Sequence, residues 1–175
     1  LSRNPLFESG WEDPGEKGEN LAIVQFPTFH IQRLAGYAKA SVSRRYLEPF
    51  NLSLPEWRLL TLIAESSPVS FADITARTLM DKGQVSRTLR SLQGRGLVET
   101  GPVVERKAAG RGAGVNPRVS VTLLPAGRAL FEQILPVARE HQARLISLLN
   151  PEERRMFLQV VERLMAEGTK ADSDI

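Results

Sequence analysis

The sequence contains no cysteine and only two histidines, His30 and His141. The absence of cysteine excludes disulfides, thiolate nucleophiles and thiol-based redox sensing, and it removes the usual ligands of structural zinc sites. The sequence also lacks metal-site spacing, a glycine-rich phosphate loop and a catalytic triad. These absences predict that the protein is not an enzyme and that it holds no metal or other cofactor.

Long hydrophobic runs are missing as well. No apolar run approaches the roughly 18 residues of a membrane-spanning helix, so no membrane contact is expected. The first residues show no basic region followed by an apolar core, which argues against a signal peptide. The expected location is therefore cytoplasmic. The 175 residues, of which 42% are hydrophobic and 25% charged, suffice for a globular core.

Charge is unevenly distributed along the chain, although the net charge is only +3. Residues 77–118 contain nine basic and three acidic residues, whereas residues 1–20 contain two basic and five acidic residues. A basic middle segment is typical of proteins that bind a polyanion, most often nucleic acid.

Helical spacing of apolar residues begins at Thr28 and continues to Tyr46, and Pro49 is expected to end this first helix. Two shorter helices follow, opened by Ser53-Leu-Pro-Glu56 and by Ser70-Phe-Ala-Asp73. In each motif a serine precedes an acid by three residues, which is the pattern of a helix N-cap. The two serines could also be read as nucleophiles, but their position at helix starts favours capping.

The next segment, residues 82–94, predicts a short helix whose two faces differ in chemistry. Val85, Leu89 and Leu92 form one apolar stripe at helical spacing. The opposite face is polar and basic and carries Gln84, Arg87, Arg90 and Ser91. Such a helix can anchor in a core while it offers arginines to phosphates and base edges. Because a short helix and a tight turn near residues 81–83 precede it, the order predicts a helix-turn-helix.

A β-hairpin is expected after this helix, which the pair Arg95-Gly96 ends. Residues 97–104 and 118–124 are β-prone, and residues 105–117 between them are basic and contain three glycines. This tip is longer than a tight turn needs, so the hairpin is interpreted as a wing.

Two long helices are expected at the C-terminal end. Pro125 opens the first, which continues beyond Pro136 because the apolar period resumes there. Asn150-Pro-Glu-Glu153 caps the second, and Gly168 is expected to end it. The two adjacent carboxylates of this motif fit a first helical turn, where the helix dipole favours negative charge, and imply no catalytic pair.

This order of elements resembles the MarR family of winged-helix transcription regulators over residues 28–167. The segments that carry the resemblance are Gln84-Val-Ser-Arg-Thr-Leu-Arg-Ser-Leu92, Arg95-Gly-Leu-Val98, Pro125-Ala-Gly127 and Asn150-Pro-Glu-Glu153. The resemblance implies a mainly α fold with a small β-hairpin wing (α+β), that is, a winged helix-turn-helix with long N- and C-terminal dimerisation helices. It also implies a homodimer, a palindromic operator of double-stranded DNA, and repression relieved by a small aromatic or anionic ligand.

The expected domain organisation follows from this resemblance. It comprises a flexible acidic N-terminal arm (1–27), an N-terminal dimerisation helix (28–52), a winged helix-turn-helix DNA-binding domain (53–124), C-terminal dimerisation helices (125–168) and a frayed tail (169–175). Two features depart from the family pattern. The wing lacks the acid that commonly precedes its arginine, and Leu124 stands where a threonine usually caps the long helix.

The expected DNA contacts fall into three groups. Arg87 and Arg90 suit phosphates or guanine edges, and Gln84 suits adenine or a phosphate. Backbone contacts are expected from Lys82, Ser86, Thr88 and Ser91. Contacts from the wing are expected from Arg106, Lys107, Arg111 and Arg118. Of these, Arg111 is the first choice for the minor groove and Arg118 the second.

A ligand pocket in similar proteins lies between the first two helices and the winged domain. By rough location, the candidate ligand-binding residues here are His30, Arg33, Tyr37, Trp57 and Arg58. Each also has a structural reading: the two aromatic rings suit a core, the arginines suit solvent, and the histidine suits a surface or dimer contact.

The same sequence features are compatible with a second function class. A winged-helix domain can serve protein–protein contact without sequence-specific DNA binding, with its long terminal helices joined to a larger assembly. Affinity for random duplex DNA at low salt separates this alternative from a DNA-binding regulator.

Overall fold

The computed structural model describes residues 9–78, 80–102 and 119–171. The chain divides into two compact units, Leu1–Arg58 and Leu59–Ile175. This division falls inside a helix, α3 (Leu54–Ser66), whereas the expected domain border lies between residues 52 and 53, just before that helix. The unit from residue 59 onward also includes the C-terminal helices, which were expected to form a domain of their own.

The first unit begins with a small folded segment and continues as a long helix. Its elements are α1 (Ser9–Glu12), a 3₁₀ turn η2 (Ile23–Gln25), α2 (Pro27–Val42), a π turn η3 (Ser43–Leu47) and a 3₁₀ turn η4 (Glu48–Phe50). The predicted first helix is confirmed, with a π turn and then a 3₁₀ turn after Val42 in place of a uniform helix up to Pro49. None of the residues of α2 is buried.

Residues 9–26, which belong to the arm expected from composition, carry hydrogen bonds of their own. The indole Nε1 of Trp11 donates a 2.6 Å hydrogen bond to the carbonyl of Gln25, and the Gln25 side chain accepts one of 2.8 Å from the backbone of Ala22. Gln25 is buried as a result, at 6% exposure. A glutamine and a tryptophan therefore order a segment that shows no apolar period.

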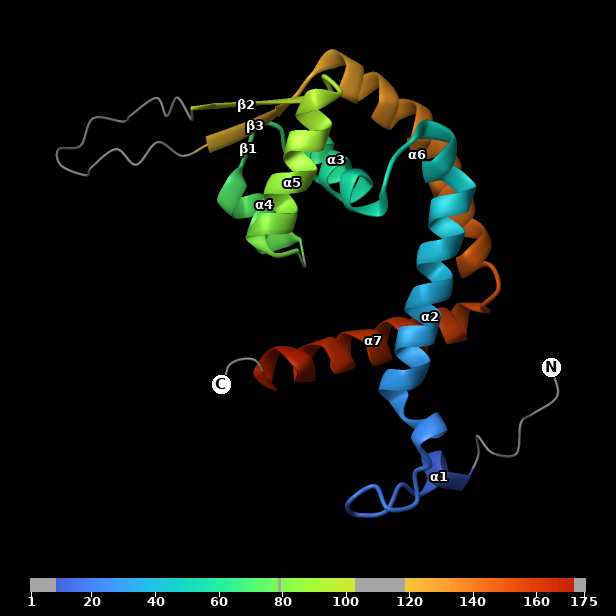
Figure 1. Cartoon of the computed structure of the whole chain (residues 1–175). Coiled ribbons are helices and arrows are strands. Elements are labelled where there is room, and N and C mark those ends of the chain that lie inside the picture. Colours follow the sequence, from blue (N-terminus) through green and yellow to red (C-terminus); the bar gives the residue numbers. More distant parts are fainter. Residues whose placement is uncertain (1–8, 79, 103–118, 172–175) are drawn as a thin grey trace, which may run out of the picture. The chain divides into compact units, whose positions relative to one another are not determined.

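The second unit contains the sheet and the remaining helices (Figure 1). After α3 come β1 (Val69–Ser70), α4 (Phe71–Arg77), α5 (Lys82–Gly94), β2 (Val98–Pro102), β3 (Val119–Leu123), α6 (Pro125–Ile146) and α7 (Pro151–Ala171). Three antiparallel strands are ordered β1-β3-β2. The predicted hairpin is confirmed, with Val98 opposite Leu123 and Pro102 opposite Val119. The two-residue strand β1 was not predicted, since two residues show no alternation.

The core of the winged region combines apolar residues from every element around the sheet. Leu59, Leu60 and Ile63 of α3 and Ile74 of α4 are fully buried. Three residues of α5 and one from each long strand are also buried, namely Val85, Leu89, Leu92, Val98 and Val121. The mainly helical fold with a small antiparallel sheet agrees with the predicted class.

The two C-terminal helices begin and continue as their caps and prolines predict. α6 runs through Pro136, and its N-cap residue Leu124 offers no side-chain hydrogen bond. At the start of α7, the Asn150 Oδ1 accepts hydrogen bonds of 2.9 and 3.0 Å from the backbone of Glu152 and Glu153. The prediction that Gly168 ends this helix is wrong, because α7 extends to Ala171.

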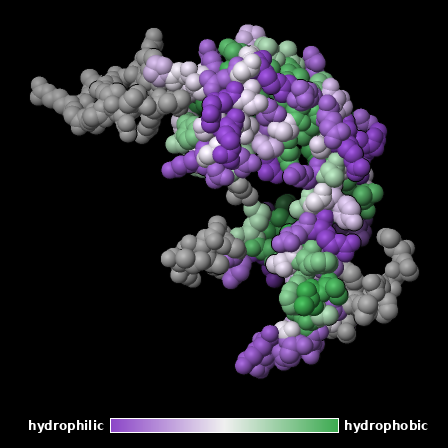
Figure 2. All heavy atoms as spheres, in the orientation of Figure 1, coloured by the Kyte–Doolittle hydropathy of each residue, from purple (hydrophilic) through white to green (hydrophobic). Residues whose placement is uncertain are grey.

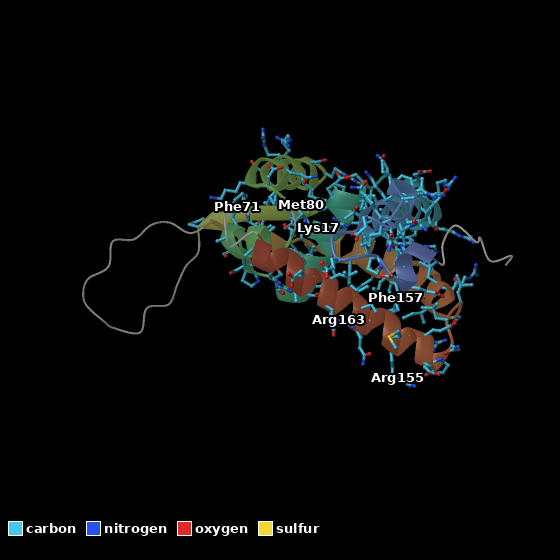
Figure 3. The ribbon with its side chains drawn as sticks, turned by 90° about the horizontal axis from the view of Figure 1, so that it is seen from below. Lys17, Phe71, Met80, Arg155, Phe157 and Arg163 are labelled. Carbon is cyan, nitrogen blue, oxygen red and sulfur yellow. The ribbon has the colours of Figure 1, made fainter. Side chains whose placement is uncertain are left out.

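Large apolar side chains remain exposed along α7. Phe157, which lies between Arg155 and Arg163 on this helix (Figure 3), is 52% exposed, and Leu158 is 58% exposed. Within the described part of the chain, no helix is both long and apolar enough to span a membrane.

Candidate nucleic-acid interface

Each of the two helices α4 and α5 begins with a side-chain cap. At the start of α4, the Ser70 Oγ accepts a 3.0 Å hydrogen bond from the Asp73 backbone and donates one of 2.6 Å to the Asp73 carboxylate. At the start of α5, the Asp81 carboxylate accepts a 2.8 Å hydrogen bond from the Gln84 backbone. Met80 is buried in the turn between these caps, and Figure 3 labels it together with Phe71, the first residue of α4. The predicted helix-turn-helix is therefore present.

Ser53 shows the same arrangement at the start of α3. Its hydroxyl donates a 2.7 Å hydrogen bond to the Glu56 carboxylate, which also accepts one of 2.7 Å from the Ser53 backbone. Both serines that could be read as nucleophiles thus cap helices, and Ser53 also shows the reciprocal backbone hydrogen bond of a capping box. The structural interpretation of these motifs is confirmed.

The inner face of α5 is the predicted apolar stripe. Val85 and Leu92 are fully buried, and Leu89 is 3% exposed. Full burial of one such side chain contributes about 1.5–3 kcal/mol. The three residues together fix the rotation of α5 about its axis and thereby decide which side chains face solvent.

The outer face of α5 is basic and open to solvent. Lys82, Arg87, Arg90 and Ser91 are exposed, while Gln84 and Ser86 are half-buried. Thr88 differs from these six, because it lies beside the apolar stripe and is only 8% exposed. With so little of the residue exposed, Thr88 is poorly placed for the expected contact with a DNA backbone.

The arginines of this face lie back along the helix toward its N-terminus. The Nε of Arg90 donates a 3.4 Å hydrogen bond to the carbonyl of Ser86. The Nη1 of Arg87 lies 3.2 Å from the position that a Cβ on Gly83 would occupy. Because Gly83 has no side chain, the Arg87 guanidinium can lie along the first turn. Gly83 is the second residue of α5, whose bounds match the predicted helix over residues 82–94.

The C-terminal end of α5 is joined to the sheet. Gly96 has φ = +65°, its N–H donates to Gln93, and the N–H of Leu97 donates 3.0 Å to the carbonyl of Leu92. This pair of hydrogen bonds is a Schellman motif, which glycine favours because it adopts positive φ without strain. The Gln93 side chain also donates 2.9 Å to the hydroxyl of Thr100 on β2.

The start of α6 is locked to the same point of the chain. The Leu124 N–H donates a 3.0 Å hydrogen bond to the Leu97 carbonyl, and Gly127 lies so close that a Cβ there would overlap this carbonyl oxygen. On the other side, Arg128 donates 3.2 Å to the carbonyl of Ala64 near the end of α3. Sequence reasoning missed this joint, and its one sequence signal is the glycine in the first turn of α6.

The described part of the wing consists of its two strands. β2 ends at Pro102 and β3 begins at Val119, so the basic tip lies between the ends of two paired strands. The four basic residues expected to reach DNA from the wing, Arg106, Lys107, Arg111 and Arg118, lie outside the described residues.

Of the five candidate ligand-binding residues, His30 and Arg33 lie in one group and Trp57 lies in another, all within the first unit. His30, in the first turns of α2, has its ring 5.9 Å from that of Trp11, and the Arg33 guanidinium lies 5.7 Å from the ring centre of Phe29. Trp57 is buried and packs edge-on against Tyr46, which follows the other end of α2. A helix of 16 residues is about 24 Å long. The two groups are thus too far apart along α2 to contact one small ligand together.

The remaining two candidates have different surroundings. Tyr37, midway along α2, is 68% exposed, and Arg58 on α3 is exposed beside Trp57 in sequence. In the described residues there is no group of three or more His, Asp or Glu side chains placed to hold a metal ion.

The three-stranded sheet, the capped turn between α4 and α5, and the basic outer face of α5 together define a winged helix-turn-helix protein. The model of the MarR family matches residues 50–108, which include the turn and α5. The HTH-type transcriptional repressor Rv2887 of Mycobacterium tuberculosis is 28% identical over 134 residues, which are 77% of this chain and 89% of the repressor. Over these residues the chain is similar to the MarR family of transcriptional regulators.

Two solved structures share the fold. The structure of M. tuberculosis Rv2887 in complex with salicylic acid has a TM-score of 0.58 and 25% identity, covering 82% of this chain and 99% of that one. The S. aureus MepR–DNA complex has a TM-score of 0.71 and 17% identity, covering 81% of this chain and 98% of that one.

Proposed function

We propose that this protein is a homodimeric repressor that binds a palindromic operator in double-stranded DNA through α5 and the wing. One observation carries the proposal: α5 buries Val85, Leu89 and Leu92 and exposes Arg87 and Arg90 on its outer face. A helix held in this way by its apolar stripe cannot rotate about its axis, so its arginine-bearing face stays turned toward solvent. That is the requirement for a helix that reads the major groove.

Each exposed residue of α5 has a role that follows from its chemistry. Arg87 and Arg90 pair with phosphates or with the O6 and N7 acceptors of guanine, and Gln84 pairs with adenine or a phosphate. Lys82, Ser86 and Ser91 contact the backbone, which positions the helix without reading sequence. Because Arg87 lies along the first turn over Gly83, it must swing outward to reach a base edge.

The wing supplies the second contact. Its basic residues follow β2 and precede β3, so they approach the DNA from the hairpin while α5 occupies the major groove. Arg111 is proposed for the minor groove, with Arg118 as the next candidate. An Arg111→Ala variant should bind less tightly and with a smaller salt dependence, since one phosphate contact fewer releases fewer counterions.

Titration of duplex DNA with the full-length protein tests the proposal. Arg87→Ala should weaken specific binding by about 1–3 kcal/mol. The matched control is Arg139→Ala, which removes the same charge from an exposed position on α6 and should leave affinity nearly unchanged. Equal affinity of the Arg87 variant and the wild type would remove α5 from the reading role. Negligible affinity of the wild type for random duplex at low salt would favour the protein–protein interaction module instead.

A two-fold dimer explains why the operator is proposed to be palindromic. Two reading helices related by two-fold symmetry contact half-sites separated by about one helical turn of DNA, roughly 34 Å. A protein that acts on chromosomal operators works in the cytoplasm, which is the location proposed here.

Release by a small aromatic acid is the remaining part of the proposal. The support comes from Rv2887, whose structure contains salicylic acid. The first group combines the ring of Phe29 with the guanidinium of Arg33, and Trp57 is followed directly by Arg58 on α3. A thermal-shift titration with salicylate should raise the melting temperature of the wild type. Comparison of Arg33→Ala with Arg58→Ala then identifies the group that binds, as only one variant should lose the shift.

A further inference from the structure

Residues 9–26, the N-terminal cap, expose apolar side chains and bury polar ones. Gln25 is 6% exposed, whereas Ile23, Val24 and Phe26 beside it are 74%, 55% and 40% exposed. Phe29, one turn further on, is also 40% exposed. Figure 2 shows the resulting hydrophobic patch at the N-terminal end of α2, next to a hydrophilic turn.

The cap holds this inverted arrangement with its own hydrogen bonds. Trp11 and Gln25 join α1 to η2, and Gly10 lies so close to Asn20 and Gln25 that a Cβ there would come within 2.7 and 2.9 Å of their oxygen atoms. The intervening turn is closed by the Asn20 side chain, which donates 3.2 Å to the carbonyl of Asp13. A segment this well bonded presents its apolar residues in a fixed position, so their exposure is not a consequence of local disorder.

The exposed apolar area is large enough for a protein interface. With about 200 Å² for one large apolar residue, the patch of Ile23, Val24, Phe26 and Phe29 amounts to roughly 400 Å², within the range of the largest patches on monomers, which are often functional. Ile31, Leu34 and Tyr37 of α2 are 48%, 57% and 68% exposed and continue it. Together these residues offer roughly 750 Å², close to the about 800 Å² per partner of a standard interface.

The distribution of charge identifies the partner. The cap carries four acidic residues and one basic residue, whereas residues 27–47 carry four basic residues and no acidic one. The basic residues farthest from the cap, Arg44 and Arg45, are exposed in the turn after α2. They are separated from the cap by the whole of α2, about 24 Å, which exceeds the about 8 Å screening length at physiological salt. The acidic cap and the pair Arg44 and Arg45 therefore cannot neutralise each other within one chain, where Glu48 is the acidic residue nearest to the pair in sequence.

A second copy of the chain resolves this separation. If two α2 helices lie antiparallel about a two-fold axis, the acidic cap of each copy meets the basic end of the other. We propose that the N-terminal cap is part of the homodimer interface, in which its apolar patch packs on the partner's α2 and its acidic turn faces the partner's basic end. This inference rests on the proposed homodimer and extends it to a segment outside the long helices.

Sedimentation equilibrium of full-length variants tests the apolar part. Replacing Ile23 and Val24 together by aspartate should raise the dimer dissociation constant about 100-fold, since charges would be buried at the centre of the patch. The control is Ala72→Asp, which adds a charge at an exposed position in the first turn of α4 and should leave dimerisation unchanged. Far-UV circular dichroism checks that the variants keep their helices. A milder variant with alanine at both positions should raise the constant about 10-fold.

Charge exchange tests the antiparallel pairing. The double variant Arg44→Glu and Arg45→Glu should dimerise about 10-fold more weakly at low salt. Adding Glu12→Arg and Glu16→Arg to the same chain should restore dimerisation. Failure of this restoration would overturn the pairing. If the wild type is a dimer and the variant with aspartate at Ile23 and Val24 has the same dissociation constant, the cap inference alone is overturned. If that variant also loses thermal stability, the cap packs on its own chain. A wild-type monomer at every concentration would overturn the homodimer and the cap together.

Discussion

Gly127 is the residue at which a single methyl group should disturb the winged domain. A Cβ at this position would overlap the carbonyl oxygen of Leu97 and lie 2.8 Å from a methyl group of Leu123 and 3.0 Å from the Leu97 carbonyl carbon. Two of these three atoms are backbone, so a rotamer change cannot relieve the overlap. Gly127→Ala must instead move the start of α6 away from the segment that joins α5 to β2.

The expected free-energy change follows from three contributions. Overpacking of a filled space costs about 1–3 kcal/mol. Loss of the 3.0 Å hydrogen bond from Leu124 to Leu97 costs about a further 0.5–1.5 kcal/mol. Against these, alanine is better than glycine inside a helix by about 0.5–1 kcal/mol. The net result should be a destabilisation of about 0.5–4 kcal/mol. Each kcal/mol corresponds to roughly 2–4 °C in melting temperature for a chain of this size.

Urea unfolding at one fixed protein concentration, followed by circular dichroism, measures this change. Gly94→Ala is the matched control, because a Cβ on Gly94, the last residue of α5, meets nothing within 4 Å. That variant should be neutral or slightly stabilised, by up to about 1 kcal/mol. If Gly127→Ala is as stable as the control variant, the close joint between α6 and Leu97 is not present in solution.

Three further predictions concern caps, core and pH. Ser70→Ala should destabilise by about 0.5–2 kcal/mol because it removes the N-cap of α4, and Ser70→Asp should recover most of this loss in the same urea experiment. Leu89→Ala should destabilise by about 2–5 kcal/mol, and a DNA titration below its unfolding midpoint should show weaker binding, since the rotation of α5 depends on this side chain; unchanged stability would contradict its burial. The pKa of the Glu19 carboxyl lies below its ordinary value because backbone N–H groups, first its own and then that of Lys17, donate to the carboxylate. Its contribution to the turn is therefore present above the ordinary glutamate pKa and is lost as the pH falls through the lowered value. An NMR titration should show the amide signals of residues 15–19 shifting in that acidic range in the wild type. The same shift in a Glu19→Gln variant would show that another group than the Glu19 carboxyl causes it.

Local features of the winged region were predictable because they depend on residues close in sequence. Ser53, Ser70 and Asp81 each bond to a backbone N–H three residues later, and the apolar stripe of α5 depends on helical spacing alone. The hairpin of β2 and β3 follows from two β-prone segments around a glycine-rich tip. In each case the interacting groups are set by the chain's own periodicity.

Features that depend on distant residues were not predictable in the same way. Trp11 and Gln25 order the N-terminal cap through one hydrogen bond across 14 residues, which composition does not indicate. Thr88 belongs to the polar set by residue type, yet the packing of α5 buries it. Likewise, the candidate ligand residues were grouped by rough position, and the length of α2 separates them into two groups.

The sequence by itself determined that a helix with an apolar and a basic face follows a capped turn, because capping and amphipathicity are local and periodic. It also determined that the charge is concentrated in the middle of the chain. Only the tertiary structure decided how that helix is held. The joint between Leu97 and Gly127 brings together residues 30 positions apart, because the absence of a side chain on Gly127 lets two backbones meet. The exposure of the apolar patch on the cap depends on the hydrogen bonds that Gln25 and Trp11 form in the folded chain.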